Sequence, residues 1–185
     1  MTATHSPTPF APVRLEHASR LINHGPTVLV TAAHGGRINL MAAAWSMPVE
    51  FTPPRIAVVI DKRTFTHELV MATGRFGVCV PGADLLDATY GVGVVSGRDV
   101  DKFATCGLTP LPAALVAAPL IAECYASLEC RVTDRQLVDS YNFFVLEVVK
   151  AWIDPAIKDP RTLHHRGRGA FMVAGETIRL RSKMK

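Results

Sequence analysis

Two short segments of this 185-residue sequence gather charged and hydroxyl side chains that could form a binding site. The first is DKRTFTH, residues 61–67, which places two cations, two hydroxyls and a histidine at a predicted helix start. Free backbone N–H groups there carry partial positive charge, hydroxyls donate to phosphate oxygens, and Arg63 offers a forked donor. The segment therefore fits either a phosphate site or an ordinary threonine helix cap with solvated neighbours.

The second segment is SGRDVDKF, residues 96–103, a glycine-led turn that opens a short helix. Asp99, Asp101 and Lys102 fall near the start of that helix. Carboxylates there are favoured by the helix dipole, and a lysine is usually solvated. By itself, the segment decides nothing about function.

Other chemistries find little support in the sequence. The glycines of GVGVVSG, residues 91–97, miss the dinucleotide-binding spacing by one residue and lack a surrounding βαβ pattern. His164 and His165 have no carboxylate partner at metal-ligand spacing and are expected in a basic, solvent-facing loop. No GxSxG elbow is present, and Cys106 is interpreted as a small buried residue. We expect neither a metal site nor a hydrolase.

The four cysteines form no CxxC pair, so neither a zinc site nor a disulfide framework is predicted. They are interpreted as reduced, mostly buried thiols.

The elements that position these segments are mostly strands. Residues 27–33 and 38–45 are two β-capable runs around a glycine pair, which predicts a hairpin. A strand over 56–60, a threonine-initiated helix over 66–73 ending at Gly74, and a strand over 76–80 follow. A short helix is expected over 13–24.

The second half of the chain is predicted to begin with loops and short helices up to Pro119 and to continue with two long strands. Residues 121–133 and 141–152 are almost continuously apolar, which indicates burial on both faces. We expect a flexible arm over 1–12 and one domain over 13–185. The predicted fold is mainly β with inserted helices, a Greek-key-like barrel of about six strands.

Composition excludes several partners. Apolar residues make up 49% and charged residues 19% of the chain, so a large core is expected. The net charge of +4 is scattered rather than gathered into runs that would follow nucleic acid. No signal peptide or membrane-spanning run is recognised. We expect a cytoplasmic protein with no nucleic-acid or membrane partner.

Taken together, these segments resemble the flavin reductase-like family, in particular its flavoredoxin and ferric reductase branch. The resemblance extends over residues 25–176. The segments that carry it are NLMAAAWSMP (39–48), TPPR (52–55), RTFTHEL (63–69), GRF (74–76), SGRDVDKFA (96–104), GLT (107–109), APLIAEC (118–124) and LEC (128–130). It implies a dimeric, FMN-binding split β-barrel with flavin at the subunit interface.

The resemblance also implies roles for particular residues. The segment from Asn39 to Ser46 would run along the isoalloxazine, with backbone groups of Ala44 to Ser46 on its pyrimidine edge. Trp45 would form a wall of the ring site, although it fits plain core as well. The 5′-phosphate would be held by Arg63, Thr64, Thr66 and His67, while Ser96, Gly97 and Lys102 approach from the loop.

Two segments depart from the family pattern. Many flavin reductases carry Gly-Asp-His where this chain has VDSYN, residues 138–142, so direct use of NAD(P)H is in doubt. Tyr141 is assigned instead to a flavin-side position. The tail RGRGAF, residues 166–171, fits the family only loosely, and Phe171 is assigned to the site.

The sequence thus predicts an FMN-dependent oxidoreductase that passes electrons from a reductant, with NAD(P)H expected, to free flavin, a ferric chelate or a partner protein. The alternative is a non-catalytic FMN-binding electron carrier reduced by a separate protein. A structural or interaction barrel with a vestigial pocket is a third possibility, which the retained phosphate cluster disfavours.

Overall fold

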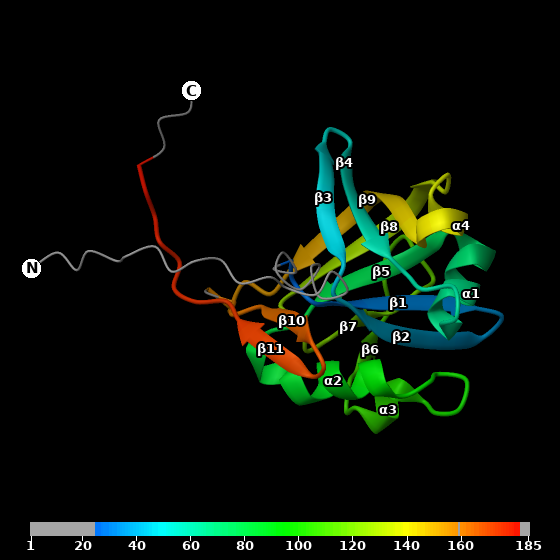
Figure 1. Ribbon diagram of the computed structural model, residues 1–185, viewed down its shortest axis with the longest axis horizontal. Helices are drawn as coiled ribbons and strands as arrows, with labels where there is room; N and C mark the ends of the chain where they lie inside the picture. Colours follow the sequence, from blue (N-terminus) through cyan, green and yellow to red (C-terminus); the bar gives the residue numbers. More distant parts are fainter. Residues whose placement is uncertain (1–24, 159, 182–185) are drawn as a thin grey trace, which may run out of the picture.

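The computed structural model describes residues 25–158 and 160–181 (Figure 1). The predicted arm over 1–12 and the predicted helix over 13–24 lie outside the described residues.

Seven strands form one antiparallel sheet with the order β2-β1-β5-β8-β9-β4-β3. Their bounds are β1 (Val28–His34), β2 (Arg37–Ala43), β3 (Ser46–Phe51), β4 (Pro54–Val59), β5 (Arg75–Val80), β8 (Ala126–Asp134) and β9 (Phe143–Ile153). Two small hairpins pair β6 (Pro110–Leu111) with β7 (Leu120–Ile121) and β10 (Leu163–Gly167) with β11 (Ala170–Val173). The helices are α1 (Phe65–Thr73), α2 (Leu86–Val94), α3 (Lys102–Thr105) and α4 (Val138–Tyr141), with a 3₁₀ turn, η2, at Ala83–Leu85.

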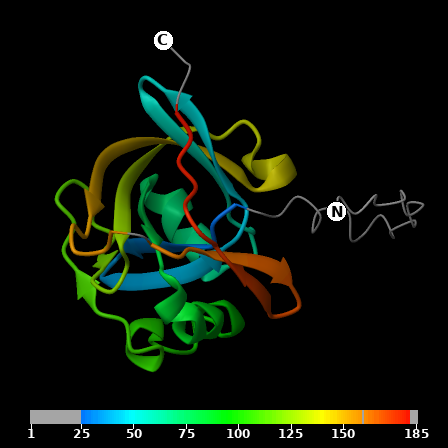
Figure 2. The ribbon, with the colours of Figure 1, turned by 90° about the vertical axis from the view of Figure 1, so that its left-hand side faces the viewer.

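The two edge strands of the sheet, β2 and β3, are consecutive in the chain, so the sheet must curl to bring its edges together. Strand β2 ends at Ala43 and β3 begins at Ser46, so only Ala44 and Trp45 separate the two edges. The Trp45 carbonyl accepts a hydrogen bond of 3.0 Å from the Val59 N–H of β4. Figure 2 shows the strands arranged around a common interior. The fold is a split β-barrel, as the sequence predicts.

The first hairpin and the end of the first helix are confirmed. Gly35 and Gly36 both adopt positive φ in the turn that pairs His34 with Arg37. Such angles suit the primed turns of hairpins and cost a glycine little. Helix α1 ends at Gly74, whose N–H bonds to the Val70 carbonyl at 2.7 Å.

The start of that helix differs from the prediction. Helix α1 begins at Phe65, and its cap is Thr64 rather than Thr66. The Thr64 hydroxyl accepts a hydrogen bond from the His67 N–H at 3.2 Å. Thr66 lies inside the first turn and is fully buried.

Two apolar clusters lie on opposite faces of β1. Val28, Val30 and Ala32 pack into the barrel interior with α1, while Leu29 packs with α2 and α3 on the outer face. Because side chains alternate across a strand, the residues on both faces of β1 must be apolar when both faces are covered. This explains why β1 carries apolar residues at consecutive positions, Val28 to Val30, rather than at alternate ones.

Several expectations about strands were wrong. The main sheet has seven strands rather than about six. The strand that was not predicted is β3, which lies at an exposed edge of the sheet. The predicted strand over 121–133 is interrupted by a turn, so that β7 pairs with β6 and β8 begins at Ala126. Strand β9 is not buried on both faces, since only the alternate residues Phe144 and Leu146 are buried, and its end, Ala151 to Ile153, is exposed.

Strand β3 presents apolar side chains to the surface. Met47, Val49 and Phe51 are exposed, and Phe51 retains 93% of its accessible surface. Pro48 sits in the middle of the strand, and a bulge follows between Pro48 and Glu50. Figure 1 shows the β3–β4 hairpin extending beyond the rest of the sheet.

A buried carboxylate fastens the loop before β7 to the sheet. Glu129 on β8 is fully buried and accepts hydrogen bonds from the N–H groups of Ala114, Leu115 and Val116 and from the indole of Trp152. Burial raises the pKa of Glu129, but these hydrogen bonds outweigh burial, and the pKa ends below its usual value.

Glu129→Gln is expected to lower the free energy of unfolding at pH 7 by about 1–3 kcal/mol, because an amide nitrogen meets donors that require an acceptor. A carboxylate with a lowered pKa contributes stability above its unfolded pKa, near 4.5, and loses it as pH falls through the folded value. The difference in the free energy of unfolding between the wild-type protein and the Glu129→Gln variant should therefore shrink below about pH 4.5. Urea unfolding at pH 7 and at pH 4 measures it.

Glu147→Gln is the matched control, because Glu147 lies on neighbouring β9 and forms a surface ion pair with Arg131 at 3.0 Å. Its cost should stay below about 1 kcal/mol. Equal losses in the two variants would contradict the proposed role of Glu129.

Candidate functional site

A cavity of about 360 Å³ lies between β2, the start of α1, the end of α2 and the loop that follows. We call it cavity A. It brings together side chains from three segments that are distant in the sequence. Of the predicted site residues it gathers Asn39, Arg63, Thr64, Thr66, Ser96, Gly97 and Lys102.

A buried amide joins the three segments. The Asn39 side chain on β2 donates from Nδ2 to Thr66 Oγ1 on α1 at 2.9 Å. On its other side a Cβ at Gly97 would lie only 1.9 Å from Asn39 Oδ1. The loop therefore approaches β2 closely only because residue 97 has no side chain.

The start of α1 directs unpaired donors at the cavity. The Thr64 hydroxyl is used internally, donating to the Asp61 carbonyl at 2.8 Å and capping His67. The N–H groups of Phe65 and Thr66 have no hydrogen-bond partner in the described part of the chain. The Thr66 hydroxyl accepts from Asn39 and keeps its own proton to donate.

Arg63 lines the cavity but is already paired. Its guanidinium bonds to Asp61 at 2.8 Å and 3.1 Å, and 86% of its side chain is exposed. Hydrogen bonds from Arg63 lower the pKa of Asp61 to about 2. A forked contact from Arg63 to an anion would therefore have to compete with this carboxylate.

Arg98 is a second cation at the cavity, which the sequence analysis missed. Its guanidinium pairs with Glu68 of α1 and donates to the Arg63 carbonyl at 3.2 Å. It also lies 5.6 Å from the centre of the Phe65 ring. Its position in the same glycine-led turn as Ser96 was the sequence feature that could have placed Arg98 at the cavity.

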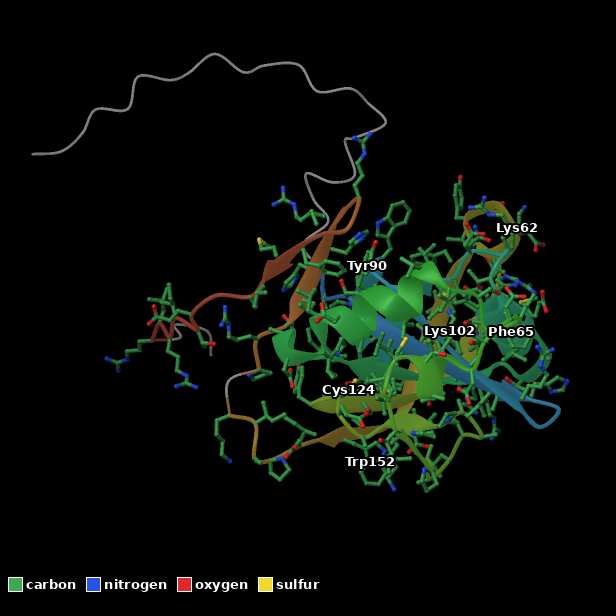
Figure 3. The ribbon with its side chains drawn as sticks, turned by 90° about the horizontal axis from the view of Figure 1, so that it is seen from below. Lys62, Phe65, Tyr90, Lys102, Cys124 and Trp152 are labelled. Carbon is green, nitrogen blue, oxygen red and sulfur yellow. The ribbon has the colours of Figure 1, made fainter. Side chains whose placement is uncertain are left out.

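Lys102 is buried, with 6% of its surface exposed, although a solvated lysine is the usual case. Its ammonium donates to the Val92 carbonyl at 2.8 Å, and no carboxylate among the described residues pairs with it. Burial lowers its pKa below the usual value, and Cys106 opposes that shift only partly. Figure 3 shows Lys102 and Phe65 toward the same end of the molecule. A buried cation without a carboxylate favours an anion in the cavity.

His67 and Tyr141 lie elsewhere. The His67 ring packs edge-on against Phe144, with 5.5 Å between centroids, and its Nε2 is buried without a partner among the described residues. Burial lowers its pKa, which favours the neutral ring. Tyr141 on α4 is 68% exposed. Neither side chain lines cavity A.

Two further cavities continue along the end of β2. Cavity B, of about 400 Å³, shares Ala42, Gly93 and Val94 with cavity A and includes Phe171. Cavity C, of about 540 Å³, shares Ala44 with cavity B and includes Trp45 and Ser46. Trp45 is 55% exposed, so it is not core. The segment from Asn39 to Ser46 thus lines all three cavities in succession.

The expectation of a basic loop around His164 was wrong. His164 and His165 lie on β10, and the His165 ring contacts the Phe171 ring on β11 at 4.9 Å. The hairpin positions Phe171 at cavity B. The alternation of apolar and polar residues that marks a strand is weak in β10, which is short and polar. The sequence pattern therefore did not predict this hairpin.

The described residues contain no group of three or more His, Cys, Asp or Glu side chains arranged to hold a metal ion. Within the same residues, no helix has the length and apolar character needed to cross a membrane. Residues 91–94, which carry two glycines of the near-miss motif, lie inside α2 rather than in a strand-to-helix turn. Cys106 ends α3 and is half-buried.

The fold and these cavities define a class of protein: a split β-barrel with three adjoining cavities along the segment from Asn39 to Ser46. Comparison with known proteins places the chain within that class. Residues 20–171 match the model of the flavin reductase like domain, and the chain belongs to this family.

Similar proteins are known from several organisms. The uncharacterized protein YddH of Escherichia coli is 44% identical over 91% of this chain and 97% of its own. A solved FMN-binding domain of a flavin reductases-like enzyme from Shewanella baltica is 37% identical, with a TM-score of 0.78, covering 92% of this chain and 96% of that one. Flavoredoxin from Methanosarcina acetivorans is 27% identical with a TM-score of 0.81, covering 95% and 97%.

Gly97→Ala is expected to lower Tm by several degrees, corresponding to about 1–3 kcal/mol, because the new methyl group displaces the Asn39 amide. Gly93→Ala is the matched control, since a Cβ there meets only the Ala42 Cβ at an ordinary 3.7 Å and alanine favours the helix. Thermal unfolding of both variants measures the difference. A Gly97 variant as stable as its control would show that the close approach is unimportant.

Proposed function

We propose that this chain binds FMN, with the phosphate in cavity A and the isoalloxazine along the segment from Ala42 toward Trp45. The observation that carries the proposal is that one cavity gathers three kinds of donor. They are buried Lys102, which pairs with no carboxylate among the described residues, the unpaired N–H groups at the start of α1, and the Thr66 hydroxyl. Each of these groups suits a dianionic phosphate or a negatively charged ring. The likeness to an FMN-binding domain from Shewanella baltica supports the choice of FMN as the ligand.

The residues of cavity A have distinct tasks in this proposal. Thr66 and the first N–H groups of α1 hold the phosphate, while Asn39 fixes the orientation of the Thr66 hydroxyl. Lys102, held by the Val92 carbonyl, places positive charge beside the cofactor. When bound, flavin supplies the electron-transfer chemistry, and the protein supplies orientation and electrostatic tuning.

The proposed activity is that of an oxidoreductase, which receives electrons from NAD(P)H and delivers them to free flavin, a ferric chelate or a partner protein. A second candidate is an electron carrier reduced by another protein. It is favoured by residues 138–142, where the Gly-Asp-His of many flavin reductases is absent and the exposed Tyr141 stands on α4. The likeness to a flavoredoxin also supports it.

Steady-state oxidation of NADH and NADPH by the FMN-loaded protein distinguishes these candidates. A reductase should turn over with at least one nicotinamide in the presence of excess free flavin. A carrier should show no turnover above the rate of free FMN, yet accept electrons from dithionite. Purified protein without flavin absorbance and without affinity for added FMN would reject both.

A homodimer is also proposed, with the exposed apolar side chains of β3 and Trp45 as candidate contacts. Light scattering at micromolar concentration tests it. A monomeric mass for protein with FMN bound would reject it.

Thr66→Val is expected to weaken FMN binding about tenfold to a hundredfold while leaving riboflavin binding nearly unchanged, because a charge-assisted hydrogen bond to the phosphate is lost. The ratio of the two dissociation constants is the measurement, since it is insensitive to any loss of folding stability. Thr66→Ser keeps the hydroxyl and should keep the ratio. A ratio unchanged in the valine variant would move the phosphate away from Thr66.

Lys102→Met is expected to lower the reduction potential of the bound flavin and to weaken reduced FMN more than oxidised FMN. A cation that binds the anionic reduced ring better must raise the potential, and coupling of this kind amounts to about 1–3 kcal/mol. Lys62→Met is the matched control, because Lys62 is exposed and does not line cavity A. Equal loss of both redox forms would instead place Lys102 at the phosphate.

A further inference from the structure

Cavity B adjoins the proposed flavin ring along Ala42 and Ala44, and it has further polar lining residues to which that proposal gives no role. This part of the cavity is formed by α2 on one side and the β10–β11 hairpin on the other. The lining residues there are Thr89, Tyr90, His165, Arg168 and Phe171. We propose that it binds the anionic group of a planar aromatic molecule, such as an aromatic carboxylate, beside the flavin.

The first observation is a hydroxyl without a partner. Thr89 on α2 is fully buried, and its Oγ1 makes no hydrogen bond with any described residue. Leaving a buried hydroxyl unpaired costs free energy that a ligand oxygen in the cavity would recover. The same side chain lines cavity B.

The second observation is Arg168, an exposed cation that lines cavity B from the turn between β10 and β11. Gly167, Arg168 and Gly169 have consecutive φ values of 94°, 54° and 74°. Such angles are rare for a residue with a side chain, and they fix where the Arg168 side chain leaves the backbone. Arg168 forms no ion pair with the described residues, and no carboxylate is among those that line the cavity.

The third observation is the pair of aromatic side chains that flank these polar groups. Tyr90 is half-exposed on α2 and packs against the hairpin turn, where a Cβ on Gly169 would lie 3.5 Å from the Tyr90 ring. The Phe171 ring packs against the His165 ring, with 4.9 Å between the ring centroids. Figure 3 shows Tyr90 on the side of α2 that faces the hairpin, away from Phe65.

These features together define the ligand class. Two aromatic rings favour a planar molecule, and Arg168 with the Thr89 hydroxyl favours a carboxylate at one end of it. Cavity B measures about 400 Å³ in all, and the proposed flavin ring along Ala42 and Ala44 would share it, so the ligand must be small. A phosphate dianion would find its stronger donors in cavity A, where the helix start lies.

The inference rests on the proposed function for its flavin neighbour, but the binding site itself can be tested separately. The FMN-loaded full chain is titrated calorimetrically with 2-naphthoate and, for comparison, with the neutral 2-naphthamide. Wild-type protein should bind naphthoate at least tenfold more tightly than the amide.

Arg168→Gln should reduce naphthoate affinity at least tenfold and leave naphthamide affinity unchanged, while Arg168→Lys restores part of the loss. Arg166→Gln is the matched control, because Arg166 is exposed on the same hairpin and does not line cavity B. Thr89→Val should reduce affinity for both ligands several-fold, and Thr89→Ser should restore it. Thermal melting of each variant shows whether it is folded.

Four outcomes overturn the inference. Naphthoate binds no better than the amide, or Arg166→Gln is as damaging as Arg168→Gln. Naphthoate and FMN exclude each other, in which case cavity B holds the flavin ring. Arg168→Gln weakens FMN but not riboflavin, which assigns Arg168 to the phosphate. Failure of wild-type protein to bind FMN, with Arg168-dependent naphthoate binding intact, would reject only the proposed function.

Discussion

The buried side chain of Asn39 is the contact on which the candidate site depends. It links β2 to α1 through Thr66, and it leaves room for the following loop only at Gly97. Since β2 is an edge of the split sheet, this amide fixes the position of that edge relative to the helix start. Three segments converge on this buried amide, and cavity A lies between them.

Charge at the site is distributed unevenly between surface and interior. Arg63 and Arg98 are partly exposed and hold carboxylates, so solvent and neighbours weaken their fields. Lys102 is buried, donates to a carbonyl and faces no carboxylate among the described residues. A ligand in cavity A would therefore experience the charge of Lys102 with the least screening, although its sequence position alone suggests an ordinary surface residue.

Local chemistry was predictable from the sequence and tertiary contacts were not. The glycine turn of the first hairpin, the end of α1 at Gly74 and the grouping of Arg63, Thr66 and Lys102 follow from residue types and family resemblance. The pairing of Arg63 with Asp61 and the rotation of His67 toward Phe144 depend on neighbours that spacing does not reveal. The cap at Thr64 lies within the usual uncertainty of helix boundaries. The β10–β11 hairpin was missed because its strands are short and polar.

Strand β3 combines exposed apolar side chains with two features that oppose pairing of its edge with another strand. An edge strand with exposed Met47, Val49 and Phe51 would ordinarily template the addition of further strands, as in amyloid growth. Pro48 removes one N–H from that edge, and the adjoining bulge breaks the regular spacing of the remaining donors. Another chain can therefore contact this face through side chains, while the missing donor and the bulge oppose the pairing of a further strand along β3.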